Sequence, residues 1–330
     1  MVFHHLVSNE ISKMVRKRRY QVVLLIVFAL VALFSYGEQQ AAKALTQQLG
    51  TSDWHVQVQE EITRDLNELQ SPFLSSGEKA AISAAIKEAE YELQHNVNPN
   101  APGAPSFMRG FIDDGTTLLI PMLVVVIASD MVSSEMSGGT IKMLLTRGVS
   151  RFQVLLGKVV ALFLLVALLM ATIAVAAYVV SGLFFGYQGF NLPILFGFHT
   201  NASGYVNLSH VYTMALWRYL VMAYGLGFVS SISVAALSLM VSTLVRSTAS
   251  GIGIMMAALI AGALLANLAS TWTQAKYLPM VNLALTGYLN GSPPPINGMT
   301  FTFSLADLGV SSLLALVVSF VVFIRRDMMG

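Results

Sequence analysis

The stretch that decides the fold runs from Phe152 to Phe185 and reads FQVLLGKVVALFLLVALLMATIAVAAYVVSGLFF. It contains a single charged residue, Lys158, and it is longer than the roughly 20 apolar residues that a membrane-spanning helix needs. A helix of this length must tilt, bend or extend beyond the bilayer. The whole chain agrees, because 55% of its 330 residues are hydrophobic and 11% are charged, whereas about 25% are charged in soluble domains. The composition predicts an integral membrane protein.

Five other apolar runs complete a set of six predicted spans. The six are 21–36, 116–132, 152–185, 212–244, 249–271 and 305–324. We therefore predict an all-α membrane protein with six transmembrane helices, an amphipathic interfacial helix at the N-terminus and an extracytoplasmic helical hairpin between spans 1 and 2. The corresponding regions are 1–20, 21–36, 37–115 and a five-span domain over 116–330, with an outer segment at 272–303.

The basic residues predict the orientation of these spans. Twelve of the 19 Lys and Arg residues precede the first span, follow the second or the fourth, or end the chain. Since cytoplasmic segments carry an excess of Lys and Arg, we expect both termini to be cytoplasmic. The connection 187–211 has no charged residue and is expected outside. We expect a multi-pass protein of a bacterial plasma membrane.

The segment 37–115 is expected outside and carries 12 acidic and 5 basic residues. Apolar residues recur at helical spacing in two stripes, and Ser75 with Glu78 forms a capping-box pattern before the second stripe. These features predict the hairpin. The stripes are Trp54, Val58, Ile62, Leu66 and Leu69, then Ile82, Ala85, Ile86, Ala89 and Leu93.

The N-terminus has the pattern of a helix lying at the membrane surface. Its apolar face is predicted to contain Phe3, Leu6, Val7, Ile11, Met14 and Val15. A secretory signal cleaved after Ala42-Lys43-Ala44 is the alternative interpretation. The long, amphipathic basic region favours the retained helix.

Motifs for catalysis are absent from the sequence. There is no phosphate-binding loop of the G-x-x-x-x-G-K-[ST] type and no H-E-x-x-H motif. The chain has no cysteine, and its formal charge of +2 is too small to indicate nucleic-acid binding. We predict no enzyme activity and no metal site in this chain. Charged residues within or near the spans are either functional or interfacial; they are Asp130, Arg218 and Asp307.

The connection between the second and third spans is unusually basic for so apolar a chain. It reads SEMSGGTIKMLLTRGVSRFQVLLGK from Ser134 to Lys158, and it resembles the coupling region of type-2 ABC transporter permeases. KYLPMVNLALTGYLNG (276–291) and FIRRDM (323–328) resemble the outer segment and the C-terminal ending of the same family. Gly148 departs from the proline that relatives often carry. The matching residues of the connection are Glu135, Gly139, Thr140, Lys142, Leu144, Leu145, Thr146, Arg147, Val149, Ser150, Arg151, Leu156, Gly157 and Lys158.

The resemblance implies the membrane subunit of an ABC exporter that hydrolyses no ATP itself. It implies two copies of a cytoplasmic ATPase subunit, which bind ATP and Mg²⁺, and a second permease subunit, identical or homologous. The coupling segment 134–151 would dock on the ATPase through Glu135, Gly139, Thr140, Lys142, Leu145, Arg147 and Arg151. A solvated basic loop is the simpler interpretation of that segment. A membrane sensor or receptor, or an intramembrane enzyme, with the hairpin as its sensing domain is the alternative function.

Overall fold

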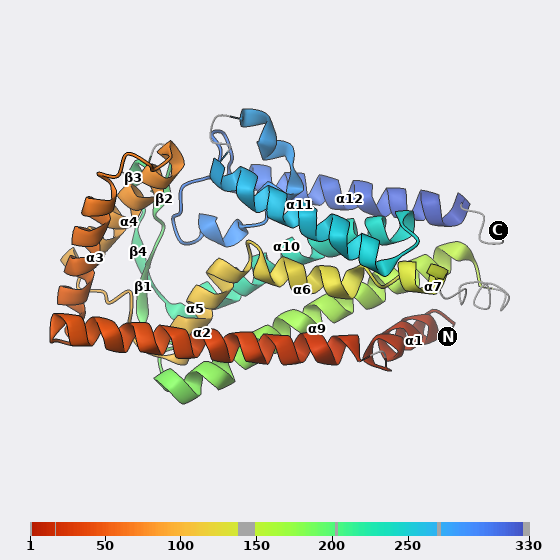
Figure 1. Cartoon of the computed structure of the whole chain (residues 1–330), viewed down its shortest axis with the longest axis horizontal. Helices are drawn as coiled ribbons and strands as arrows, with labels where there is room; N and C mark the ends of the chain where they lie inside the picture. The colour runs from red at the N-terminus through yellow and green to blue at the C-terminus, as the bar shows by residue number, and fades with distance from the viewer. Residues whose placement is uncertain (1, 17, 138–148, 202–203, 269–271, 326–330) are drawn as a thin grey trace.

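The computed structural model describes residues 2–16, 18–137, 149–201, 204–268 and 272–325 of the chain. Within them, six helices are long and apolar enough to cross a membrane, at Tyr20–Leu49, Leu119–Met136, Arg151–Phe185, Leu216–Leu244, Thr248–Ala266 and Phe301–Arg325. The prediction of a six-span helical protein is confirmed. Figure 1 shows the two chain ends at one end of the bundle, here called the terminal end, and the hairpin at the opposite end, here called the hairpin end.

The first half of the chain contains the N-terminal helix, the hairpin and the second span. Its elements are α1 (Val2–Arg16), α2 (Arg19–Leu49), α3 (Trp54–Glu68), α4 (Ser76–Gln94), α5 (Ala104–Gly115), α6 (Leu119–Ala128) and α7 (Ser133–Ser137). Helix α2 continues without a break well beyond Tyr36, where the first span was expected to end. Helix α5 was not anticipated; its buried Phe107, Met108 and Ile112 belong to the core of the bundle.

The second half contains four long helices and the connections at the hairpin end. Its elements are α9 (Arg151–Phe185), β1 (Pro193–Phe196), β2 (His199–Thr200), β3 (Val206–Asn207), β4 (Tyr212–Ala215), α10 (Leu216–Leu244), α11 (Thr248–Leu268), the 3₁₀ turns η1 (Thr273–Tyr277), η2 (Pro279–Val281) and η3 (Leu285–Tyr288), and α12 (Phe301–Arg325). The strands form two antiparallel pairs, β1 with β4 and β2 with β3. The fourth helical span begins at Leu216 rather than at Tyr212, because Tyr212–Ala215 pairs with β1.

Helix α9 is the central element of the bundle, in contact with α1, α2, α5, α6, α10 and α12. A reciprocal capping box begins it: Gln153 N donates to Ser150 Oγ at 3.2 Å and Ser150 N donates to Gln153 Oε1 at 3.3 Å. Leu155, Leu162 and Leu169 on its inner face are fully buried. The apolar run that decides the fold therefore forms the core of the molecule.

The helices approach one another through small side chains, as helices in membranes commonly do. Helices α10 and α12 pack against each other, and both carry buried small side chains, including Ser238, Ala315 and Ser319. A Cβ at Gly227 of α10 would lie 3.1 Å from both Ile112 and Thr116. Such packing replaces the hydrophobic driving force, which is weak between helices in lipid.

The two helices of the predicted hairpin form, and most of the two apolar stripes pack between them, although Leu66 and Ala85 are exposed. Val58, Ile62 and Ile86 are buried between α3 and α4, and Trp54, Leu69, Ile82, Ala89 and Leu93 pack around them. Glu78 N donates to Ser75 Oγ at 3.2 Å, and Ser75 N donates to Glu78 Oε2 at 2.8 Å. The expected capping box is confirmed.

The hairpin also packs on the bundle, through α4 and the strands. Ala84 of α4 shares a small core with Leu195, Phe198 and Val206, and Tyr91 lies edge-on to Phe198 with ring centroids 5.8 Å apart. Gly291 closes this contact. Its φ of +83° is one that side chains disfavour, and a Cβ there would lie 2.6 Å from Glu88 Oε1 and from Phe198 Cβ.

We predict that Gly291→Ala loosens the hairpin from the bundle. The left-handed backbone costs roughly 1–2 kcal/mol for a residue with a Cβ, and the clash with Glu88 and Phe198 adds to it. Thermal unfolding of the purified chain, followed together with protease cleavage between α3 and α4, measures the effect. Gly287→Ala is the matched control, because a Cβ there meets only Ser292 Cβ at 3.7 Å; equal stability of the two variants would contradict the prediction.

Candidate functional site

Four charged side chains form a closed ring of ion pairs at the terminal end, here called the ion ring. Glu10 and Lys13 come from α1, Glu135 from α7 and Lys158 from α9. Lys13 Nζ lies 2.8 Å from Glu10 Oε1 and 2.8 Å from Glu135 Oε1. Lys158 Nζ lies 2.8 Å from Glu10 Oε2 and 2.8 Å from Glu135 Oε2. Each carboxylate thus bridges both ammonium groups, and the four formal charges cancel.

Lys158 is the most deeply buried member of the ion ring. Its side chain has no exposed surface, whereas that of Lys13 is 32% exposed. Lys158 Nζ donates hydrogen bonds to Glu10 Oε2 at 2.8 Å and to Met131 O at 3.1 Å, beyond the end of α6, and Glu135 Oε2 is its second ion-pair partner. A buried charge is tolerated only when it is paired and hydrogen-bonded, and Lys158 meets both conditions.

Lys13 remains charged although it is partly buried. Burial by itself favours the neutral amine, but hydrogen bonds to the Glu10 and Glu135 carboxylates outweigh it and hold the pKa of Lys13 above its usual value. Its charge is therefore maintained by the two carboxylates of the ion ring. The ion ring fixes α1 to the start of the expected coupling segment and to the central helix.

The apolar face of α1 packs on α9 next to the ion ring. Leu6 lies 3.3 Å from the position of a Cβ at Gly157, and Met14 is buried. Leu6, Val7 and Ile11 are partly buried, while Phe3 and Val15 are exposed. Most of the face that was expected to lie on the membrane surface thus covers the bundle.

Asp130 lies in a second polar cluster where α6 ends and α7 begins. Ser242 Oγ of α10 accepts from Val132 N at 3.2 Å and from Ser133 N at 3.0 Å, and donates to Ser129 O at 2.9 Å. Thr248 Oγ1 donates to Asp130 Oδ1 at 3.2 Å. A helix interruption inside a membrane protein needs such substitutes for its lost backbone hydrogen bonds. The break before α7 is thus built into the packing with α10 and α11.

The other predicted site residues have different surroundings. Arg151 is the first residue of α9, and its Nη1 donates to Ile324 O at 2.9 Å, at the C-terminal end of α12. Ser150 before it is extended, with φ −67° and ψ 146°, so the coupling segment and α9 do not form one continuous helix. Gly139, Thr140, Lys142, Leu145 and Arg147 lie outside the described residues.

The two other charged residues singled out near the spans lie at the hairpin end. Arg218 is exposed in the first turn of α10 and stacks on Trp217, with its guanidinium 5.5 Å from the ring centroid. Asp307 of α12 accepts from Asn282 Nδ2 at 3.1 Å. Neither joins Asp130, which belongs to the terminal end.

Glu10, Lys13 and Lys158 were not among the residues predicted for the functional site. Two signals in the sequence point to them: Glu10 is the sole acidic residue before Glu38, and Lys158 interrupts a long apolar run. The sequence does not show that the two meet, because 148 positions separate them along the chain.

An apolar groove of about 900 Å³ runs along the bundle between α2, α5 and α6. Leu30, Phe34, Phe111 and Met122 are among its lining residues, and Glu38 and Asp114 are its acidic ones. A groove of this size lies in the range of small-molecule sites, roughly 300–1,000 Å³. It can accept an apolar molecule or an apolar helix.

Partly buried acidic side chains of α4 and α5 gather at the hairpin end. Burial, reinforced by the neighbouring Glu92, raises the pKa of Glu88 to about 8, although Arg109 opposes the shift. Burial likewise raises the pKa of Glu92 to about 7. Arg109 lies 5.1 Å from the centroid of the Tyr219 ring, and Tyr219 Oη donates to Asp113 Oδ2 at 2.6 Å. This cluster joins the hairpin to the bundle electrostatically.

The geometry and composition define the class of this protein as a multi-pass α-helical membrane protein. Comparison with known proteins gives the family: a model described as "Protein of unknown function (DUF2705)" matches residues 83–329, and the chain belongs to that family.

Two relatives from Bacillus subtilis (strain 168) resemble the chain. "Uncharacterized protein YhcI" is 29% identical over 280 residues, which are 84% of this chain and 85% of the relative. "Uncharacterized membrane protein YdbK" is 27% identical over 212 residues, which are 64% of this chain and 78% of the relative.

We predict that Lys158→Met destabilises the protein by about 3–5 kcal/mol, because it leaves two buried carboxylates facing a single ammonium group. Lys13→Met is the matched control and should cost less, since Lys13 is partly solvated. Chemical or thermal unfolding in detergent measures both. Equal losses of stability in the two variants would show that Lys158 contributes no more to the ion ring than Lys13 does.

We also predict that the hairpin end loses stability as pH rises. Glu88 and Glu92 have folded-state pKa values of about 8 and about 7 against 4.5 for the free side chain. Between the free and the folded-state pKa values the folded state therefore binds more protons than the unfolded state. Its stability falls as the pH rises from about 5 to about 8. Melting temperatures across this pH range measure how steeply stability falls with pH. Glu88→Gln should reduce this pH dependence, whereas the control Glu68→Gln, at an exposed position, should leave it unchanged.

Proposed function

We propose that this chain is the membrane-spanning permease subunit of an ATP-binding cassette exporter, driven by a separate cytoplasmic ATPase subunit. The observation that carries the proposal is the ion ring. It joins Glu135, at the start of the segment that resembles a coupling region, to the N-terminal helix and to the central helix of the bundle. A force applied to that segment would pass directly into the core.

In this proposal the terminal end faces the cytoplasm. The excess of Lys and Arg at that end supports the orientation, and it places the segment 134–151 where an ATPase can reach it. The ATPase would bind ATP and Mg²⁺, because this chain has no phosphate-binding loop. Two ATPases and two permeases, identical or homologous, would form the working assembly.

The apolar groove between α2, α5 and α6 supports a transport path. It lies along the membrane-spanning part of the bundle, and a second permease placed against it would close a passage between the two subunits. Side-chain packing holds the core next to the groove, while the ion ring ties the N-terminal part of α9 to α1 and α7. ATP-driven movement of the coupling segment would thereby shift α9 and α6, and with them the groove that α6 helps to line.

The test is isolation of the full-length tagged chain from its native membrane, with mass spectrometry of what copurifies. We expect an ATPase that contains a phosphate-binding loop, and ATP hydrolysis by the complex. The chain alone should hydrolyse no ATP above a mock preparation. Robust hydrolysis by the pure single chain would contradict the permease proposal.

We predict that Lys142→Glu with Arg147→Glu weakens ATPase binding by about tenfold or more. Charged contacts at an interface contribute roughly 1.5–3 kcal/mol each, and 1.4 kcal/mol corresponds to a factor of ten. Copurified ATPase per permease, measured after washing, gives the change.

Lys79→Glu with Lys87→Glu is the matched control, because it makes the same charge change on the hairpin. It should retain the ATPase. If the coupling-segment variant also retains it at the wild-type level, the segment is a solvated basic loop and the docking role is wrong.

A further inference from the structure

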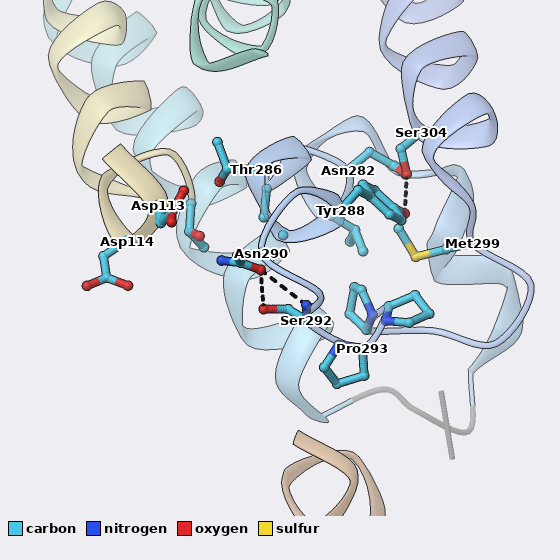
Figure 2. Close-up of a pocket in the computed structure, with 16 residues that line it drawn as sticks. Asp113, Asp114, Asn282, Thr286, Tyr288, Asn290, Ser292, Pro293, Met299 and Ser304 are labelled. Atoms are coloured by element: carbon cyan, nitrogen blue, oxygen red, sulfur yellow. Dashed lines mark hydrogen bonds between the residues drawn. The ribbon is translucent and has the colours of Figure 1, made fainter. Parts of the chain in front are cut away.

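A polar cavity of about 310 Å³ lies at the hairpin end, remote from the ion ring and from the segment 134–151. The C-terminal end of α5, the turns η2 and η3 with the loop after them, and the beginning of α12 surround it. Figure 2 shows Asp113 and Asp114 on one side and Tyr288, Met299 and Ser304 on the other. Exposed Asp114 and Ser292 mark its opening to solvent.

The lining of this cavity is rich in hydrogen-bond acceptors and carries negative charge. Asp113 and Asp114 contribute two carboxyl groups, and no Lys or Arg is among the described residues that line the cavity. The loop Pro293–Pro295 forms part of its wall, and proline has a carbonyl but no N–H to donate. The chemistry of the wall selects a ligand that donates hydrogen bonds and carries positive charge.

Asn282 supplies a buried hydrogen-bond acceptor to the lining. It is 2% exposed, and its Nδ2 donates to Lys276 O at 2.7 Å, Leu278 O at 3.1 Å and Asp307 Oδ2 at 3.1 Å. These three acceptors fix the orientation of the amide, so the remaining atom, Oδ1, must be an acceptor. Among the described residues this buried oxygen has no hydrogen-bond partner. A buried acceptor left unpaired costs free energy, which a donor on a ligand would recover.

Several other polar side chains of the wall have hydrogen-bond partners. Tyr288 Oη and Ser304 Oγ lie 2.9 Å apart, and Thr286 Oγ1 lies 3.0 Å from Thr116 Oγ1. Asn290 Oδ1 accepts from Ser292 Oγ at 2.6 Å. The cavity is therefore formed in advance, and binding would require little reordering of its walls.

We propose that this cavity binds a small organic cation that carries at least one ammonium group. The carboxylates of Asp113 and Asp114 would balance its charge, and Asn282 Oδ1 would accept one of its N–H groups. The volume lies at the lower limit of small-molecule sites, which suits a ligand of a few heavy atoms rather than a peptide or lipid. The proposal does not depend on the permease function, since it uses residues remote from the segment 134–151.

The test uses the full chain in lipid nanodiscs at pH 7.5, with 1,4-diaminobutane as the probe. Isothermal titration should give saturable binding, and the melting temperature should rise with probe concentration. Uncharged 1,4-butanediol, of similar length, is the matched control ligand and should have neither effect.

Two variants separate the site from general effects on the protein. Asp114→Asn removes one charge at an exposed position and should weaken probe binding by about tenfold, the effect of losing one charged contact. Ala284→Leu, in the cavity wall, should fill the space and abolish binding while its melting temperature without probe stays near that of the wild type. Glu68→Gln, on the exposed face of α3, is the charge control and should bind the probe normally.

Three outcomes would overturn the proposal. The diol could stabilise the protein as much as the diamine, both variants could bind the diamine with wild-type affinity, or CaCl₂ alone could produce the binding signal while the diamine does not. The last result would assign the carboxylates to a divalent cation.

Discussion

The ion ring of Glu10, Lys13, Glu135 and Lys158 is the interaction on which the terminal end of the protein depends. Lys158 has no exposed side-chain surface, so its charge is tolerated only because it is paired with both carboxylates and donates hydrogen bonds to Glu10 Oε2 and Met131 O. The same four contacts make α1 part of the fold. A helix that was expected on the membrane surface instead packs across α9. Because Glu135 is ion-paired with both α1 and α9, a movement of Glu135 would displace these two helices together.

The polar chemistry of the molecule is divided between its two ends. At the terminal end every described charge in the ion ring has an opposite partner, which gives a rigid connection. At the hairpin end the charge of Arg109 acts on the partly buried carboxyl groups of Glu88, Glu92 and Asp113, whose pKa values are raised to about 8, 7 and 6, chiefly by burial. These shifts predict that the stability of that end depends on pH, whereas small-residue packing and apolar side chains hold the bundle between the two ends.

The two proposals assign different tasks to these ends. The rigid terminal end suits force transmission from a partner ATPase, because a closed ring of short ion pairs deforms little. The acceptor-rich cavity at the hairpin end suits recognition of a cation, because Asn282 Oδ1 and Asp113 Oδ1 in its lining are buried acceptors without a hydrogen-bond partner among the described residues. The turns η2 and η3, which line the cavity, also contact α11 and α12. A ligand bound there would therefore act on the same helices that complete the bundle, in a family whose function is not known.

The sequence by itself determined the class of the protein. Six long apolar runs predicted the spanning helices. The stripes around Val58 and Ile86 with the Ser75–Glu78 capping box predicted the hairpin, because these signals are local and periodic. Helix α5 was missed, since its apolar residues follow a proline-rich linker, and the strands β1 and β4 were missed because each is only four residues long. Only the tertiary structure decided the sites. Glu10 pairs with Lys158, and Asp113 and Asn282 line one cavity, because packing brings together segments that are far apart in the chain. No local sequence pattern shows which polar side chains will lie near one another.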